Sequence, residues 1–234
     1  MVFRGPGDRM NKTGVLIAAA LAAIGLPAAL WLAFYRAPLL DQLYFNQKIF
    51  YFHVPSAFML FVAVFVCGIY SLRYLRKRNP DHDEVASAAA ELAVLFGAIV
   101  LITGSIWGKA AWNMWWDWEA RLTTALLLWM IMVAYVLVRK YGGPGSERLG
   151  AGLGVFAMLD VPLIYLSVHI WRTVHPKTSV VPGLQGTMRI AFWVAVTAFV
   201  ALFVLLMKVR LAIGRGRRQL DDVREAALDA GLFE

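Results

Sequence analysis

Cysteine is almost absent from this 234-residue sequence, in which Cys67 stands alone inside an apolar run. A single cysteine excludes an internal disulfide and a Cys-x-x-Cys-His site for covalent haem attachment. It also argues against a closed zinc site, which needs four ligands and commonly uses several cysteines. Any ligand of this chain must therefore be held without thioether bonds to it.

Charged residues are also scarce, at 16% of the sequence against 60% hydrophobic residues, and this balance excludes an ordinary soluble domain. A helix that spans a membrane needs about 20 mostly apolar residues. Six runs meet this requirement and predict an all-α polytopic bundle of six transmembrane helices. The expected spans are Gly14 to Tyr35, Ile49 to Leu75, Val85 to Ile106, Leu122 to Val138, Gly150 to Ile170 and Met188 to Val209.

The bundle accounts for one predicted domain, residues 1–209, which is followed by a tail, residues 210–234. The first apolar run is longer than the about 7–15 apolar residues of a signal peptide, so we expect a retained span. The tail is basic and then amphipathic. Such a tail is typical of contact with anionic lipid or with a cytoplasmic partner.

The distribution of lysine and arginine predicts the orientation of the bundle. Sixteen of these residues lie before the first span, between spans two and three, between spans four and five, and after the last span; the other three connections hold seven. By the positive-inside rule both termini are cytoplasmic, and the connection between the third and fourth spans lies in the periplasm. The net charge of +8 thus follows the membrane topology and does not indicate a nucleic-acid partner.

The sequence lacks a complete phosphate-binding loop. The segment from Gly104 to Lys109 looks like one, but it has one residue too few between its glycines and no Ser or Thr after the lysine. It is also predicted to lie on the side of the membrane that has no ATP. We therefore expect that this chain is not an ATPase.

Tryptophan, in contrast, is concentrated in one place. Five of the nine tryptophans lie within residues 107–121, between the third and fourth spans. If this segment were helical, side chains three and four residues apart would share a face. An indole plate would suit a flat apolar ligand with polar margins, whereas an aromatic belt at the membrane surface is the alternative. The two opposite faces expected are Trp112, Trp115, Trp116 and Glu119 on one side, and Trp107 and Trp118 on the other.

Three of the four histidines, His53, His169 and His175, are predicted to lie at this outer surface, while His82 is expected in a solvated cytoplasmic turn. Neutral imidazole binds haem iron, and two imidazoles can fill both axial positions. A porphyrin is a flat apolar disc with two carboxylates, which matches indole faces flanked by cations. The candidate partners of these carboxylates are Lys109, Arg121 and Arg172.

Polar and small residues inside the spans are expected to be structural. Asp160, near Pro162 in the fifth span, should face the bundle interior and have a partner, because an acid at mid-membrane costs about 2.5–3.5 kcal/mol. Glu91 in the third span should do the same. The glycines at positions 150, 152 and 154 are expected to let helices approach closely.

These patterns leave other functions open. A bis-histidine membrane cytochrome of the b type would transfer electrons, but its ligands would normally face one another within the spans. A multipass permease subunit would need interrupted helices and polar sites in paired halves. A purely structural assembly subunit would leave the indole plate without a role.

The sequence resembles the WWD-domain family of haem-handling proteins of system I cytochrome c maturation, and within it the CcmC (haem exporter protein C) family. The resemblance is carried by residues 104–123 and by two motifs that contain histidine, Tyr51-Phe52-His53-Val54-Pro55 and Trp171-Arg172-Thr173-Val174-His175. Two positions depart from the family pattern, because Asn113 replaces the usual Gly and Glu119 the usual Asp.

The resemblance implies that His53 and His175 are the axial ligands of a non-covalent, transiently held haem b. It gives His169 no such role. It also implies that the periplasmic segment 107–121 forms the haem platform, through Trp107, Trp112, Trp115, Trp116, Trp118, Glu119 and Arg121.

The resemblance further implies a delivery and assembly factor that is not an enzyme and that lies in the bacterial inner membrane. Proteins of this kind present haem to the haem chaperone CcmE. They work beside the small membrane protein CcmD and the ABC transporter subunits CcmA and CcmB, where ATP hydrolysis is expected.

Overall fold

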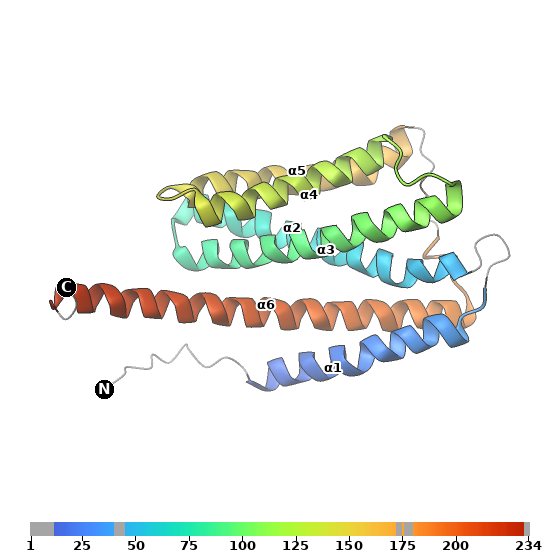
Figure 1. The fold of residues 1–234 in the computed structure, drawn as a ribbon, viewed down its shortest axis with the longest axis horizontal. Coiled ribbons are helices and arrows are strands. Elements are labelled where there is room, and N and C mark those ends of the chain that lie inside the picture. The colour runs from blue at the N-terminus through green and yellow to red at the C-terminus, as the bar shows by residue number, and fades with distance from the viewer. Residues whose placement is uncertain (1–11, 40–44, 172–174, 176–179, 232–234) are drawn as a thin grey trace.

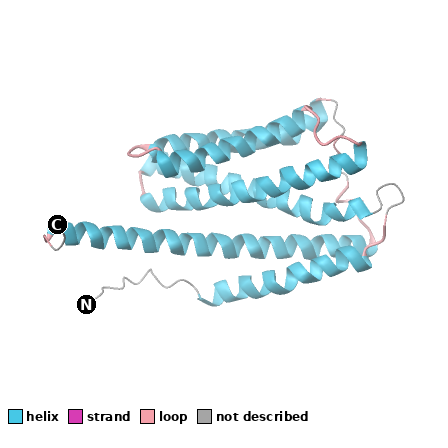
Figure 2. Ribbon diagram, in the orientation of Figure 1, coloured by secondary structure: helices cyan, strands magenta, loops and turns pink. Residues whose placement is uncertain are grey.

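The computed structural model describes residues 12–39, 45–171, 175 and 180–231. These residues form helices and short connections without a strand (Figure 2). Six of the helices are long and apolar enough to cross a membrane, which confirms the predicted six-helix membrane bundle. They are α1 (Lys12–Trp31), α2 (Phe50–Lys77), α3 (Pro80–Trp112), α4 (Ala120–Tyr141), α5 (Ser146–Ile170) and α6 (Gly186–Asp229).

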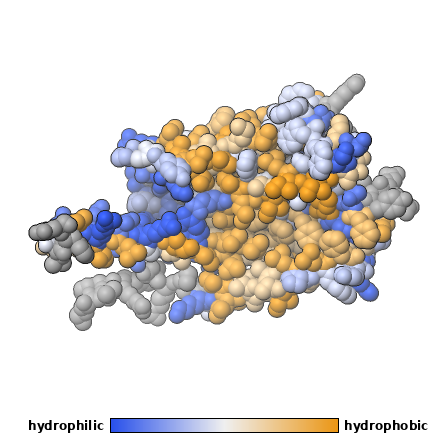
Figure 3. All heavy atoms as spheres, viewed as in Figure 1, coloured by the Kyte–Doolittle hydropathy of each residue, from blue (hydrophilic) through white to orange (hydrophobic). Residues whose placement is uncertain are grey.

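The helices form a layered bundle with two distinct ends (Figure 1). Helices α2, α3, α4 and α5 pack together, and α1 packs along α6 beside them. We call one end the tryptophan end, because residues 107–121 lie there. The opposite end, where α1 starts and α6 finishes, is the arginine end. Apolar side chains dominate the visible face between the two ends (Figure 3), as a membrane-spanning bundle requires.

A buried lysine joins the first two spans at the tryptophan end. Helix α1 continues into a π-helical turn, η1 (Leu32–Arg36), and a 3-10 helix, η2 (Phe45–Ile49), leads into α2. Lys48 of η2 is only 1% exposed and donates a hydrogen bond from Nζ to the carbonyl oxygen of Ala37 at 2.6 Å. This contact caps the end of η1 and holds the start of α2 against it.

The start of α3 corrects the prediction for His82. A solvated turn was expected, but His82 lies in the first turn of α3, where its ring contacts that of Tyr70 at a centroid distance of 5.9 Å. The helix begins early because Pro80 suits a first helical position and Asn79 is an N-cap. The Asn79 side chain accepts a hydrogen bond from the backbone N–H of Asp81 at 2.8 Å.

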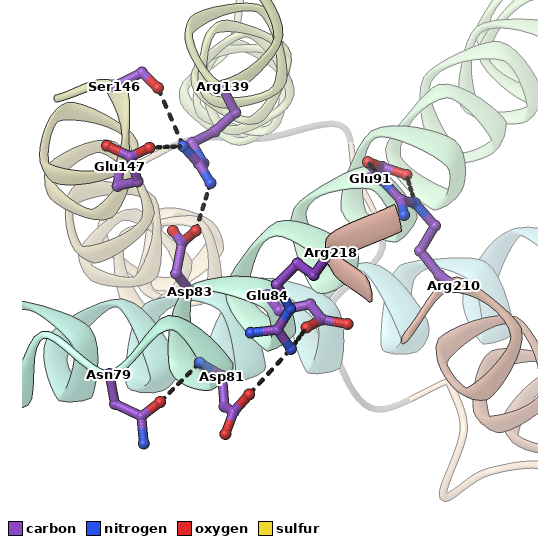
Figure 4. A network of polar contacts seen from close by, with 10 residues as sticks. All are labelled: Asn79, Asp81, Asp83, Glu84, Glu91, Arg139, Ser146, Glu147, Arg210 and Arg218. Atoms are coloured by element: carbon purple, nitrogen blue, oxygen red, sulfur yellow. Dashed lines mark hydrogen bonds and ion pairs between the residues drawn. The ribbon is translucent and has the colours of Figure 1, made fainter. Parts of the chain in front are cut away.

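Ion pairs connect α6 to α3 at the arginine end (Figure 4). Helix α6 runs without a break through residue 209 into the basic tail. Within that extension Arg210 binds both carboxylate oxygens of Glu91, so Glu91 has the partner that the sequence predicts. Further along α6, Arg218 contacts Asp81 at 3.0 Å and also binds Glu84. The first part of the tail is therefore held by the chain itself.

A second group of ion pairs joins α3 to α4 and α5 at the same end (Figure 4). Arg139 of α4 binds Asp83 of α3 and lies 3.3 Å from a carboxylate oxygen of Glu147 in α5. Its Nη1 also donates to Ser146 Oγ at 3.1 Å. The Arg139 and Asp83 side chains are only 18% and 12% exposed, so this pair is shielded from water.

Close helix contacts occur where small residues were expected. A Cβ atom at Gly154 of α5 would lie 2.6 Å from Ser71 Oγ and 3.0 Å from Cys67 Sγ of α2. A Cβ atom at Gly150 would lie 2.7 Å from Arg139 Cδ. The packing prediction is confirmed for these two glycines. A Cβ atom at Gly152 would lie more than 4 Å from any neighbouring helix, so Gly152 is not a contact point.

Asp160 faces the bundle interior, as predicted, and is 6% exposed. Its Oδ2 atom is buried and has no hydrogen-bond partner within the described part of the chain, so the expected partner is not found for that oxygen. Pro162 lies inside α5 two residues later and removes one helical N–H donor.

Replacing Arg139 with leucine should destabilise the bundle, because Asp83 would be left as a shielded charge without its cation. Loss of one partner from such a pair costs roughly 3–5 kcal/mol. Thermal unfolding of the purified protein in detergent should show a lower Tm. Arg215→Leu is the matched control, because Arg215 lies on the exposed surface of α6 and forms no ion pair with a described residue. Equal Tm values for the two variants would contradict this assignment.

Candidate functional site

A pocket opens at the tryptophan end between α2, α3, α4 and α5. It contains about 720 Å³ of space, part of it open to solvent. Much of its wall is made of apolar side chains from these four helices. Its lining includes six of the nine predicted site residues, namely His53, Trp107, Trp112, Trp116, Arg121 and His175.

The two predicted ligand histidines reach this pocket from different parts of the chain. His53 lies in the first turn of α2, and His175 lies between α5 and α6. A Cβ atom at Gly104 of α3 would lie 3.2 Å from His53 Cε1, so the absence of a side chain there lets the imidazole approach the α3 backbone closely. Both histidines line the same cavity because α2 and α5 pack against each other.

The tryptophan segment is not one continuous helix, so the expected helical plate is wrong. Helix α3 ends at Trp112 because Asn113 adopts a left-handed conformation, with φ of 61° and ψ of 21°. Residues 114–119 are non-helical, and α4 begins at Ala120. Helical spacing therefore does not decide which indoles lie together.

The indoles form two pairs instead, one within the last turns of α3 and one in the non-helical stretch that follows. Trp107 and Trp112, which were expected on opposite faces, meet edge to face with ring centroids 4.8 Å apart. Trp116 and Trp118 meet in the same way at 5.9 Å. Edge-to-face pairs of this kind are favourable for aromatic rings. Trp107, Trp112 and Trp116 line the pocket and make part of its wall aromatic.

Trp115 and Trp118 lie outside the pocket and are 61% and 75% exposed. Met114 beside them is also exposed. Large apolar side chains exposed together on one loop are typical of a surface that contacts lipid or another molecule.

Two buried nitrogen atoms in the pocket lining have no hydrogen-bond acceptor among the described residues. They are Arg121 Nη1 and Trp116 Nε1. Both groups can only donate, and a buried unpaired donor costs about 1–3 kcal/mol. Glu119 is close enough to attract Arg121 electrostatically. The arrangement therefore suits a ligand that brings an acceptor, such as a carboxylate, to this side of the pocket.

The other candidates are placed differently. Lys109 does not line the pocket; its Nζ donates to Asn113 Oδ1 at 2.7 Å. Arg172 lies outside the described residues. His169 is exposed in the last turn of α5, where its Nδ1 lies 3.3 Å from the carbonyl oxygen of Tyr165, and it does not line the pocket.

Much of the apolar wall was not predicted from the sequence. Ala57, Leu60 and Phe61 follow His53 at four, seven and eight residues, so they share its helix face, and this spacing could have identified them. No comparable signal exists for Val100 and Ile164, which reach the pocket only because α3 and α5 pack around it.

This donor set fits a haem. Imidazoles bind its iron, indole faces cover an apolar disc, and the guanidinium and indole N–H groups match carboxylates at its edge. The fit depends on the unpaired donors of Arg121 and Trp116 and on two histidines lining one cavity.

Residues 7–224 match the family model described as CcmC: Heme exporter protein C. A "Heme exporter protein C" of Bradyrhizobium diazoefficiens is 35% identical over 165 residues, covering 68% of this chain and 63% of that protein. A "Putative cytochrome c biosynthesis ccmC-like mitochondrial protein" of Marchantia polymorpha is 30% identical over 152 residues, covering 65% of each. A "Heme exporter protein C" of Rhodobacter capsulatus is 27% identical over 238 residues, covering 95% of this chain and 97% of that protein. The chain thus spans less than two thirds of the length of the first two relatives.

Asn113 should tolerate glycine but not alanine, because the left-handed conformation at the end of α3 favours Gly and Asn over other residues. We expect Asn113→Gly to leave Tm close to that of the parent protein. Asn113→Ala should cost roughly 1–2 kcal/mol. Thermal unfolding of the three proteins in detergent measures the difference, and an alanine variant as stable as the glycine variant would contradict the assigned cap.

Proposed function

The chain belongs to the CcmC family, the heme exporter protein C family, and from this premise we propose that it holds haem at the tryptophan end and delivers it for cytochrome c maturation. The observation that carries the proposal is the pocket itself. It brings His53 and His175 to one cavity together with Trp107, Trp112 and Trp116. Six apolar helices place this pocket in a multipass membrane protein.

His53 and His175 are proposed to be the axial ligands of the haem iron. Each imidazole offers one nitrogen lone pair, so the bound haem b is low-spin and non-covalent. One ligand is on a packed helix and the other on a connection between helices. Release of haem then breaks two coordinate bonds to the iron, and no thioether bond has to be broken.

Arg121 and Trp116 are proposed to bind the propionates. Their buried N–H groups have no acceptor among the described residues, and a propionate would supply one. Glu119 attracts the Arg121 guanidinium and so helps to hold it in place. This orientation puts the carboxylate edge of haem near the start of α4.

Trp115 and Trp118 are proposed to complete the platform on its outer side, where a haem acceptor must approach. Their exposure, 61% and 75%, leaves them available to a partner rather than to the pocket. We propose that the acceptor is the haem chaperone CcmE. The tryptophan end faces the periplasm, since the arginine end carries most of the basic residues.

The proposed setting is a complex in the bacterial inner membrane. CcmD, CcmA and CcmB are the proposed companions, with ATP hydrolysis assigned to CcmA and CcmB. This chain itself is proposed to act by binding and release, without catalysis. An electron-transferring b-type cytochrome is the less favoured function, because neither His53 nor His175 lies at the middle of a span. A permease is less favoured because the described spans are continuous helices.

Alanine at His53 or His175 should weaken haem binding more than tenfold, which corresponds to about 1.4 kcal/mol or more. The bis-imidazole absorption and electron paramagnetic resonance signals of the purified, haem-loaded protein should also disappear. His169→Ala is the matched control and should keep both signals. Wild-type spectra and haem content in both the His53 and His175 variants would refute the ligand assignment.

Arg121→Gln should weaken binding of haem but not of haem dimethyl ester, in which the propionate charge is removed. A charge-assisted hydrogen bond contributes about 1.5–3 kcal/mol, so the expected loss is roughly 10- to 150-fold. Titration of the parent protein and the variant with both ligands measures it. Equal losses for haem and its ester would show that Arg121 does not bind a propionate.

A further inference from the structure

The His53 imidazole makes one hydrogen bond to a neighbouring helix. Its Nδ1 lies 2.9 Å from Thr103 Oγ1 of α3. Thr103 is adjacent to Gly104, whose missing side chain leaves room for the same imidazole. Two consecutive residues of α3 therefore position the ring, one by a polar contact and one by offering space.

The direction of this hydrogen bond follows from the second contact of Thr103. Its Oγ1 lies 2.6 Å from the carbonyl oxygen of Ile99, which can only accept. A hydroxyl has one proton, and the short contact places that proton on the bond to Ile99. Thr103 Oγ1 must then accept from His53, so the proton of the neutral imidazole is on Nδ1.

This direction fixes which imidazole nitrogen can bind a metal. With the proton on Nδ1, the lone pair is on Nε2. His53 also lines the pocket, and its Nδ1 is engaged with α3, so Nε2 is the atom available to a ligand. The Thr103 side chain is itself fixed, because its hydroxyl is bonded to the backbone of its own helix one turn earlier.

We propose that Thr103 is a positioning residue for haem binding, which selects the Nδ1–H tautomer of His53 and holds its ring so that Nε2 faces the iron. This inference rests on the proposed function and extends it to a residue that does not touch haem. An acceptor on the far nitrogen also makes the imidazole a stronger donor to iron. The oxidised iron is stabilised more than the reduced iron, so the contact lowers the reduction potential of bound haem.

The test compares Thr103→Val with Thr103→Ser in the full-length protein loaded with haem. Valine keeps the shape of threonine but removes the hydroxyl, and serine restores it. Thr103→Val should release haem to apomyoglobin roughly 10- to 100-fold faster than the parent protein, the usual effect of losing such a contact. Its midpoint potential should move to a higher value. Thr103→Ser should return both quantities towards those of the parent.

Thr197→Val is the matched control. Thr197 of α6 makes the same kind of hydroxyl contact, to the Trp193 carbonyl oxygen at 2.9 Å, but is exposed and does not line the pocket. It should leave the release rate and the potential unchanged. Circular dichroism and gel filtration establish that each variant is folded, and Thr103→Ser tests the hydroxyl even if valine proves unstable.

The outcomes separate this inference from the proposed function. If Thr103→Val releases haem at the parent rate with an unchanged potential while His53→Ala loses the bis-imidazole spectrum, the role of Thr103 is wrong and the haem site stands. If His53→Ala also keeps that spectrum, the ligand assignment is wrong and the Thr103 proposal falls with it. Equal effects of Thr103→Val and Thr103→Ser would also overturn the role of the hydroxyl.

Discussion

Backbone hydrogen bonding in hydrocarbon is the constraint on which this structure depends. No water is available there to bind free N–H and C=O groups, so the chain crosses the membrane as helices. Among the residues that the structure describes, non-helical backbone lies only at the ends of the bundle. Residues 113–119, which join α3 to α4, are therefore found at the tryptophan end, and there the indoles can take directions that a helix would not allow.

The left-handed residue Asn113 marks the point where the membrane-spanning helix α3 gives way to the non-helical backbone of the site. It ends α3 directly after Trp112 and starts the non-helical path to Glu119. The Trp107–Trp112 pair stays with α3, whereas the Trp116–Trp118 pair belongs to the loop. One part of the aromatic wall is thus built on a packed helix and the other on a connection, which suits the proposed binding and release of haem.

The two ends of the bundle serve different purposes. At the arginine end, Arg139, Arg210 and Arg218 bind carboxylates of neighbouring helices and hold α3 against α4, α5 and α6. At the tryptophan end, Arg121 has a donor without an acceptor among the described residues. Ion pairs between helices stabilise one end, while buried donors without a described acceptor in the pocket lining at the other end favour a ligand. The proposed delivery of haem uses this difference.

The sequence by itself determined the six spans, because hydropathy and length are local properties that the membrane requires. It also identified His53, His175, Arg121 and the tryptophan segment as candidates, through residue types whose chemistry suits haem and through the family resemblance. Their roles as ligands and platform stay predictions.

Only the tertiary structure decided which of these residues share a cavity and what surrounds them. Periodicity grouped Trp115 with Trp112 and separated Trp107. The end of α3 at Asn113 removes Trp115 from the helix face of Trp112, and within α3 the rings of Trp107 and Trp112 meet. Thr103 gave no signal at all. Its contact with His53 joins residues on two different helices, and such contacts depend on how whole helices pack, which the local pattern of residues does not encode.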